Sequence, residues 1–342
     1  MLHTDYLLGA GNILVKMVPS LIGLGLITSL YTGLISGTEV VLISTEKDIA
    51  GLAQKLVAFV KGFGDYKAKF DLRHDSQINI FTAPAVIRAF IPSPEVTDLS
   101  FIGSMLAGGS KMEKEELDAL EKVAIQKGCT VPICNGYGQN EMAGAVTLNT
   151  VHHNKNGSAG FPTFATEIIV VDPETKNILP PNETGLVLEN SNSCFLRYEN
   201  MTEKTEAAFI TLPDGSRWFN SCDLGYFDDD GFLYITGRTT RVVIRFDVKV
   251  SLDEVERKLQ SLPFIHDCAV ISSKHDGPEE QITAFLVAPN VIETDIQSKI
   301  ENANILSGFE IPAEIYIVDK LPYKTSGKID YERLKEQYLR QR

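Results

Sequence analysis

The chain has 342 residues, which is too long for one typical core, so two domains are the first expectation. Hydrophobic residues make up 44% of it and charged residues 23%, as is ordinary for a globular protein. The formal net charge of -13 excludes a general binder of nucleic acid or of anionic membranes, because such a protein needs a basic face.

The cysteines are scattered along the chain and odd in number. No pair of them has the spacing of a metal site such as Cys-x-x-Cys, so this usage predicts a reducing compartment, the cytoplasm. The cysteines are Cys129, Cys134, Cys194, Cys222 and Cys268.

An uncharged stretch near the start raises the question of a membrane span. Between Lys16 and Glu39 no residue is charged, and the stretch is long enough to cross a bilayer. Its proline, glycines and hydroxyl residues dilute its hydrophobicity, and a β-branched run from Val40 to Ile43 follows at once. We therefore expect a buried helix followed by a buried strand, and no membrane span.

Helical and strand-like segments alternate in the rest of the first half. Residues 48–61 predict a helix, 77–81 and 99–106 predict strands, and 111–127 repeats apolar residues at helical spacing. Such alternation favours an α/β layer with a substantially parallel sheet. We expect residues 1–165 to form the α/β part of a larger domain.

From about Thr166 the chain changes to short strands separated by turns. Strand patterns at 168–171, 185–188 and 232–235 predict a small β subdomain over residues 166–238.

A third pattern begins at Ser251 and predicts a compact α+β domain over residues 241–342, with a hinge near 239–241. Its expected elements are a helix at 251–262 and strands at 268–272, 282–288 and 314–318.

Two glycine-marked segments follow apolar runs in the first half. Gly108, Gly109 and Ser110 come after the strand at 99–106, where adjacent glycines let a flat ring or a phosphate approach the backbone; the alternative is a plain strand-to-helix turn. The second segment is Asn135-Gly136-Tyr137-Gly138-Gln139-Asn140-Glu141. Its tyrosine has a face for stacking, and its amide and carboxylate suit phosphate and Mg²⁺; the alternative is a polar loop.

Two further segments carry charge in the second half. Asp223 is a single acid after an apolar run, and one acid that accepts two hydroxyl protons is the usual way to hold a ribose. The acidic run 228–231 lacks the later Glu of a calcium loop and indicates a hairpin turn. Lys328 ends a Gly-containing turn and suits contact with a developing negative charge; an ordinary surface lysine is the alternative.

Taken together and in this order, these segments resemble the superfamily of adenylate-forming enzymes: acyl- and aryl-CoA synthetases, luciferases and peptide-synthetase adenylation domains. The connecting segments 157–162, 171–175 and 254–256 add to a resemblance that extends over nearly the whole chain. It implies a truncated adenylate-forming fold, α/β and α+β in class. In that fold an α/β layer with a small β subdomain precedes a small mobile carboxy-terminal lid domain.

The resemblance also implies roles at single positions. Tyr137 is expected to stack on adenine, Asp223 to bind ribose, Glu141 to contact Mg²⁺, and Lys328 to stabilise charge on the acyl carboxylate and the α-phosphate. The residues that it assigns to the nucleotide are Gly108, Gly109, Ser110, Gly136, Tyr137, Asn140, Asp223 and Arg238.

This chain departs from the family pattern at several positions. The phosphate loop of the family, rich in Gly, Ser and Thr, belongs upstream of Met1. Asn140 stands where the family has a threonine, Arg241 where it has a hinge Asp or Lys, and Ile244 where it has a lysine. Asp247 replaces the glycine that borders the CoA channel, which argues against an easy path for the pantetheine arm.

The leading hypothesis is an acid–thiol ligase that acts on a small carboxylic acid. ATP and the acid give an acyl-AMP, with Mg²⁺ and Lys328 balancing the charge, and CoA then takes the acyl group. The alternatives are an AMP-binding remnant without efficient ATP activation, and the carboxy-terminal half of a split ligase whose phosphate loop lies on an upstream chain.

Overall fold

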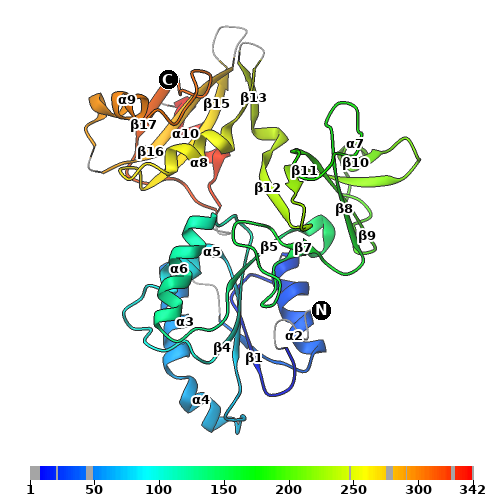
Figure 1. Cartoon of the computed structure of the whole chain (residues 1–342), viewed down its shortest axis with the longest axis vertical. Coiled ribbons are helices and arrows are strands. Elements are labelled where there is room, and N and C mark those ends of the chain that lie inside the picture. Colours follow the sequence, from blue (N-terminus) through cyan, green and yellow to red (C-terminus); the bar gives the residue numbers. More distant parts are fainter. Residues whose placement is uncertain are drawn as a thin grey trace. The chain divides into compact units, whose positions relative to one another are not determined.

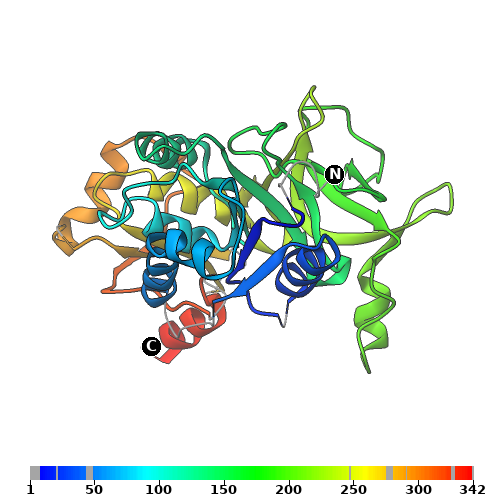
Figure 2. The ribbon, with the colours of Figure 1, turned by 90° about the horizontal axis from the view of Figure 1, so that it is seen from below.

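The computed structural model describes residues 8–20, 22–43, 49–245, 248–274, 280–289, 291–324 and 328–340. It divides into two compact units, Met1–Ser221 with Tyr226–Ile235 and Cys222–Gly225 with Thr236–Arg342. We call them the large unit and the small unit; Figures 1 and 2 show their ribbons from two sides. The domain limits inferred from the sequence, near 165 and near 239–241, remain predictions.

The large unit is built on a seven-stranded sheet in the order β2-β1-β3-β4-β5-β6-β7. The strands from β2 to β5 run parallel, and β6 and β7 join them antiparallel, so the predicted substantially parallel sheet is confirmed. The strands are β1 Ile13–Lys16, β2 Glu39–Leu42, β3 Ile78–Thr82, β4 Ile102–Gly108, β5 Ile133–Gln139, β6 Gly144–Leu148 and β7 Phe161–Pro162.

Helices α3, α5 and α6 cover one face of this sheet, and α2 lies on the other side (Figure 1). The buried side chains of α3 (Ile49–Lys61), α5 (Pro84–Phe90) and α6 (Lys114–Gln126) share one apolar core with strands β1, β3 and β4. The helices predicted at 48–61 and 111–127 are therefore confirmed as α3 and α6. Helices α4 (Phe63–Lys69) and α5 were not predicted; α5 starts at Pro84, and proline is favoured at the first position of a helix.

The uncharged stretch forms a helix, but its burial differs from the prediction. A π-helical segment η1 (Leu24–Tyr31) continues into α2 (Thr32–Ile35), with Gly25, Thr28, Ser29 and Gly33 buried. A β-carbon on Gly25 would come within 2.0 Å of the Pro19 carbonyl oxygen, so close backbone packing selects small residues for the inner face. The large apolar side chains face outward instead: Ile27, Tyr31, Leu34 and Ile35.

No helix in the described part of the chain is long and apolar enough to cross a membrane.

A second, five-stranded sheet completes the large unit, in the order β10-β11-β9-β8 with β12 paired to β11. The predicted run of short strands after Thr166 is confirmed, and the hairpin turn at 228–231 joins β11 to β12. The elements are β8 Thr166–Val171, β9 Gly185–Ser191, α7 Thr202–Ala207, β10 Phe209–Thr211, β11 Arg217–Phe227 and β12 Leu233–Arg238. The cut between the units falls inside β11 and again inside β12.

The small unit is α+β, as predicted. After the 3-10 turn η3 (Thr239–Arg241), strands β13 and β14 pair with each other, and helices α8 and α9 pack with the sheet β15-β16-β17 around one apolar core. Helix α10 was missed by the sequence reasoning. The elements are β13 Val242–Arg245, β14 Val248–Ser251, α8 Leu252–Gln260, β15 Asp267–Lys274, β16 Glu280–Val287, α9 Glu293–Asn302, β17 Glu314–Ile317 and α10 Tyr331–Arg340.

Candidate active site

The glycine-marked ends of β4 and β5 lie side by side in the large unit. Gly108 pairs with Gly136 across the two parallel strands. A β-carbon on Gly136 would come within 2.7 Å of Leu148, and Gly109 has a φ of +99°, a conformation that glycine adopts at little cost. Ser110 follows, exposed. The carboxyl ends of parallel strands are where α/β sheets bind ligands, so the end of β4 at Gly108 to Ser110 is a suitable place for one.

Tyr137 and Gln139 are held from the second sheet of the large unit. The hydroxyl of half-buried Tyr137 donates to Oε1 of Glu189 at 2.9 Å, and the amide of Gln139 donates to Oε2 at 2.7 Å. Glu189 lies on β9 with 0% of its surface exposed. The sequence reasoning missed Glu189, because it lies 52 residues from Tyr137 and belongs to no motif.

Asn135 precedes the glycine-tyrosine segment and is 6% exposed. Its amide nitrogen donates to the Met112 carbonyl at 3.4 Å, but its Oδ1 has no hydrogen-bond partner among the residues that the structure describes. A buried acceptor of this kind is costly to leave without a donor. The sequence reasoning placed Asn135 inside the motif without giving it a role.

Asn140 and Glu141 follow in the 3-10 turn η2 (Asn140–Met142). The Asn140 side-chain oxygen accepts a hydrogen bond from the Gly23 backbone N–H at 2.8 Å, so this oxygen serves the start of η1. The Tyr198 hydroxyl donates to Oε1 of Glu141 at 2.8 Å. That bond orients the carboxylate predicted to contact Mg²⁺.

No group of three or more His, Cys, Asp or Glu residues with the arrangement of a metal site occurs among the described residues. This finding is compatible with a Mg²⁺ role for Glu141, because Mg²⁺ is usually bound by one or two carboxylates together with substrate phosphates.

In the small unit, three of the predicted site residues interact with one another. Asp223, at 3% side-chain exposure, accepts a hydrogen bond from Nε of Arg238 at 2.7 Å. Desolvation by the surrounding protein lowers the pKa of Lys328, and repulsion from the Arg238 guanidinium lowers it further, while Asp223 opposes both. The predicted ribose acid, arginine and catalytic lysine therefore belong to one charged cluster.

Arg241, the predicted hinge residue, is fixed within the small unit. Its guanidinium pairs with Asp253 and, at 2.8 Å, with Glu256, and it lies 4.0 Å from the ring centre of Tyr331. Burial alone lowers the pKa of Arg241, but the nearby carboxylates raise it above its ordinary value. Asp253 also accepts a hydrogen bond from the Arg238 backbone N–H at 3.0 Å, so it holds both ends of the linker turn.

The hinge role of Arg241 stays a prediction. Ile244 is 56% exposed on β13, and Asp247, the predicted obstacle in the CoA channel, lies outside the described residues.

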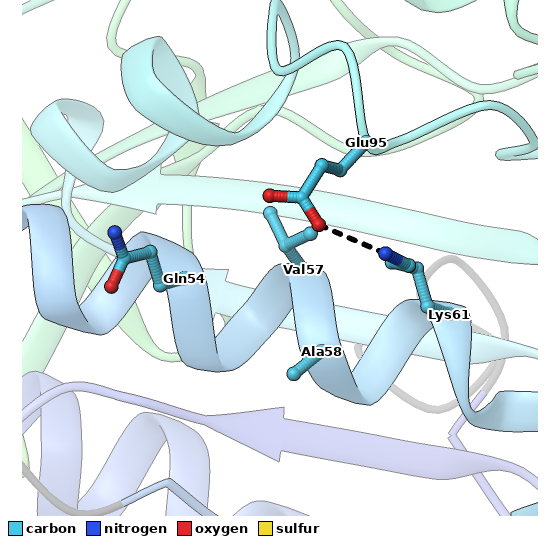
Figure 3. Close-up of a pocket in the computed structure, with 5 residues that line it drawn as sticks. All are labelled: Gln54, Val57, Ala58, Lys61 and Glu95. Carbon is cyan, nitrogen blue, oxygen red and sulfur yellow. Dashed lines mark hydrogen bonds and ion pairs between the residues drawn. The ribbon is translucent and has the colours of Figure 1, made fainter.

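A hollow of about 460 Å³ lies on the helical side of the large unit (Figure 3). Gln54, Val57, Ala58 and Lys61 of α3 line it together with Glu95, whose carboxylate pairs with Lys61 at 2.8 Å. None of the predicted site residues lines this hollow, so it is not part of the candidate site.

Comparisons with known proteins define the family and the fold of this chain. The family model of the AMP-binding enzymes matches residues 2–198, and that of the AMP-binding enzyme C-terminal domain matches residues 254–328. The chain belongs to the AMP-binding enzyme family. The resemblance inferred from the sequence and the predicted fold class are thereby confirmed.

Relatives in this family are acyl- and aryl-CoA ligases. The chain is 30% identical over 239 residues to the 2-succinylbenzoate–CoA ligase of Listeria monocytogenes, covering 69% of this chain and 46% of that protein. It is 28% identical over 277 residues to 4-coumarate–CoA ligase 1 of Glycine max, covering 78% of this chain and 91% of that protein. Apart from the Glycine max protein, the chain spans about half the length of the curated relatives that it matches.

A solved structure confirms the fold. The O-succinylbenzoate coenzyme A synthetase of Bacillus subtilis, in complex with ATP and magnesium ion, superposes with a TM-score of 0.74 at 22% identity. The superposition covers 96% of this chain and 62% of that one.

Proposed function

We propose that this chain takes part in the ATP-dependent activation of a small carboxylic acid to an acyl-AMP, followed by transfer of the acyl group to CoA. In the first step a carboxylate oxygen attacks the α-phosphorus and pyrophosphate leaves. In the second the CoA sulfur attacks the acyl carbon and AMP leaves. Family membership and the names of the CoA-ligase relatives support the reaction class.

The observation that carries the nucleotide assignment is the buried acceptor beside the bare strand ends. Oδ1 of Asn135 has no partner among the described residues, and the neighbouring positions are Gly136 and the half-buried Tyr137 ring. The exocyclic amino group of adenine is a donor of the kind that this oxygen lacks, and a tyrosine ring offers a stacking face. We propose adenine stacking for Tyr137 and backbone contacts for Gly108, Gly109 and Ser110.

The charged groups have the chemistry that the remaining steps need. Glu141 is proposed to hold Mg²⁺ together with the ATP phosphates, Asp223 to accept the ribose hydroxyls, and Arg238 and Lys328 to stabilise negative charge on phosphate and carboxylate. Residues 241–342 are proposed to act as the lid. ATP, CoA and reduced thiols occur together in the cytoplasm, where we place the reaction.

The test combines AMP calorimetry with a pyrophosphate-release and hydroxamate assay over a panel of carboxylic acids. The native chain is expected to bind AMP, and Asn135→Leu is expected to weaken binding about tenfold or more, since a buried polar contact to the base is lost. Absence of AMP binding by the folded chain would remove the nucleotide assignment.

The same assay separates the alternatives. Pyrophosphate release by the chain alone supports the complete ligase reaction. AMP binding without turnover supports a remnant, and turnover that appears only after addition of an upstream chain with the phosphate loop supports a split ligase.

A further inference from the structure

A buried carboxylate links the two sheets of the large unit at the predicted adenine position. Glu189 lies on β9 of the five-stranded sheet, opposite Ile168 of β8, and none of its surface is exposed. Its two oxygens accept hydrogen bonds from two residues of β5 in the other sheet, at 2.9 Å from the Tyr137 hydroxyl and at 2.7 Å from the Gln139 amide. The Glu189 side chain thus holds two residues of the segment 135–141, Tyr137 and Gln139.

Tyr137 and Gln139, the two residues held by Glu189, lie on either side of an irregularity in β5. The pairing of β5 with β6 shifts in register between Tyr137, opposite Thr147, and Gly138, opposite Ala145. Where a ladder shifts, the backbone hydrogen bonds fix the direction of neighbouring side chains less firmly. The carboxylate of Glu189 supplies an anchor on each side of that shift.

The Tyr137 ring is also held along its length. It packs partly buried against two apolar clusters, one with Val187 and Leu233 and the other with Met142 and Val146. A ring that is packed along its body and hydrogen-bonded at its hydroxyl keeps one orientation, which lowers the entropy lost when a base stacks on it.

We infer that Glu189 is a positioning residue that fixes the Tyr137 ring for stacking on the base of a nucleotide. The inference rests on the proposed nucleotide function. A fully buried carboxylate is costly unless donors satisfy its oxygens, and hydrogen bonds to a charged acceptor are stronger and more directional than neutral ones. Glu189 therefore gives orientation that an apolar residue in this place would not give.

The test uses two ligands that differ only in the base, AMP and ribose 5-phosphate. In Glu189→Leu neither the Tyr137 hydroxyl nor the Gln139 amide has an acceptor at position 189. We expect AMP binding to weaken about tenfold, within the range of one base–aromatic stack, while binding of ribose 5-phosphate stays within about twofold.

The conservative variant Glu189→Gln is the matched control. Its side-chain oxygen still accepts from the Tyr137 hydroxyl, and its nitrogen can donate to the Gln139 side-chain oxygen once that amide turns, so both partners remain satisfied. We expect AMP affinity to stay within about threefold of the native value, measured on samples with native circular dichroism.

The outcomes are distinct. Unchanged AMP affinity in Glu189→Leu overturns the inference and leaves the nucleotide function intact. An equal loss of affinity for both ligands, in Glu189→Leu and Glu189→Gln alike, also overturns it, because that pattern reports general damage. Failure of the native chain to bind AMP overturns the proposed function itself and this inference with it.

Discussion

In the large unit the segment 135–141 is held by uncharged donors and by tight backbone contacts at glycines, whereas in the small unit the linker at 238–241 is held by ion pairs. Tyr137 and Gln139 donate to one buried carboxylate, and Gly138 leaves no room for a β-carbon. Arg238 and Arg241 instead pair with acids. Close packing in the first region determines the positions of its side chains, whereas ion pairs in the second region determine where its charges lie.

This difference predicts that the two regions respond differently to added atoms and to salt. Contacts that depend on shape fail when atoms are added, and salt affects them little. The Arg238 side chain is 53% exposed, so its pair with Asp223 is open to screening, whereas Arg241 is only 14% exposed and is screened much less. The adenine-binding role proposed for the first region therefore depends on close packing, and the charge-stabilising role proposed for the second region depends on ion pairs.

The largest effect is expected from removing the less exposed of the two cations in the charged region, Arg241. Arg241→Ala leaves Asp253 and Glu256 without their shared cation and removes the stacking on Tyr331. These side chains are only partly buried, so loss of the shared cation costs up to about 3–5 kcal/mol. Scanning calorimetry should show a lower melting temperature for the small unit.

Arg257→Ala on the neighbouring helix α8 is the matched control. Its side chain is 48% exposed and pairs with Glu254 three residues earlier, so the expected cost is below about 1 kcal/mol. Equal shifts for Arg257→Ala and Arg241→Ala would contradict the proposed importance of the linker cluster.

The next effect concerns the charge of Lys328. Under the proposed function, Lys328→Ala should lower the rate of adenylation roughly 10²- to 10³-fold and change AMP affinity only a few-fold, because the charge that it stabilises develops in the reaction. Lys324→Ala, which removes an exposed lysine nearby, should leave both quantities near native values. Parallel losses of rate and AMP affinity in Lys328→Ala would argue against the role.

The lowered pKa of Lys328 adds a pH dependence. A lysine with a lowered pKa loses its charge at a less alkaline pH than an ordinary lysine. The adenylation rate should therefore fall on the alkaline side earlier than titration of an ordinary lysine would predict.

The sequence was sufficient for features that repeat along the chain. Apolar spacing predicted α3 and α6, and glycines after apolar runs located the paired strand ends at Gly108 and Gly136. Local patterns of this kind involve residues that are close in sequence, so they can be recognised without knowledge of the fold.

Long-range partners were not readable from the same patterns. Glu189 lies 52 residues from Tyr137, and Tyr198 lies 57 residues from Glu141. The helix from Leu24 was expected with its apolar residues inside, but close packing at Gly25 and Gly33 placed the small residues there. The side of the helix that is buried depends on the backbone that packs against it, and the tertiary fold determines which backbone that is.

A smaller effect tests the shape-dependent region. A β-carbon on Gly138 would lie 1.9 Å from the Gly144 carbonyl oxygen, so Gly138→Ala must push β5 and β6 apart and should destabilise the large unit by about 1–3 kcal/mol. Gly64→Ala is the control, because no atom lies within 4 Å of the new methyl group and the position is helical; it should stabilise by about 0.5–1 kcal/mol. Denaturant melts that rank the two variants the other way would contradict the tight packing inferred for this segment.

The smallest effect concerns one hydrogen bond from a tyrosine hydroxyl to a glutamate carboxylate in each unit. Tyr66 donates to Glu39 in the large unit and Tyr338 donates to Glu314 in the small unit, and burial, followed by the carboxylate, raises each pKa to about 12. An unfolded tyrosine loses its proton near pH 10. Between these values the folded chain holds more protons than the unfolded chain, so stability falls as pH rises from about 10 to about 12.

Removal of one of these tyrosine hydroxyls should reduce the loss of stability at alkaline pH in the unit that contains it. Tyr66→Phe should make the melting temperature of the large unit fall less between about pH 9 and about pH 11 than it does in the native chain, and Tyr338→Phe should do the same for the small unit. Because the remaining groups titrate alike in both proteins, the difference between variant and native chain isolates the one tyrosine. An identical fall in variant and native chain would show that the hydrogen bond to the carboxylate does not hold the proton, and the two units would then differ in their site regions but not in these pairs.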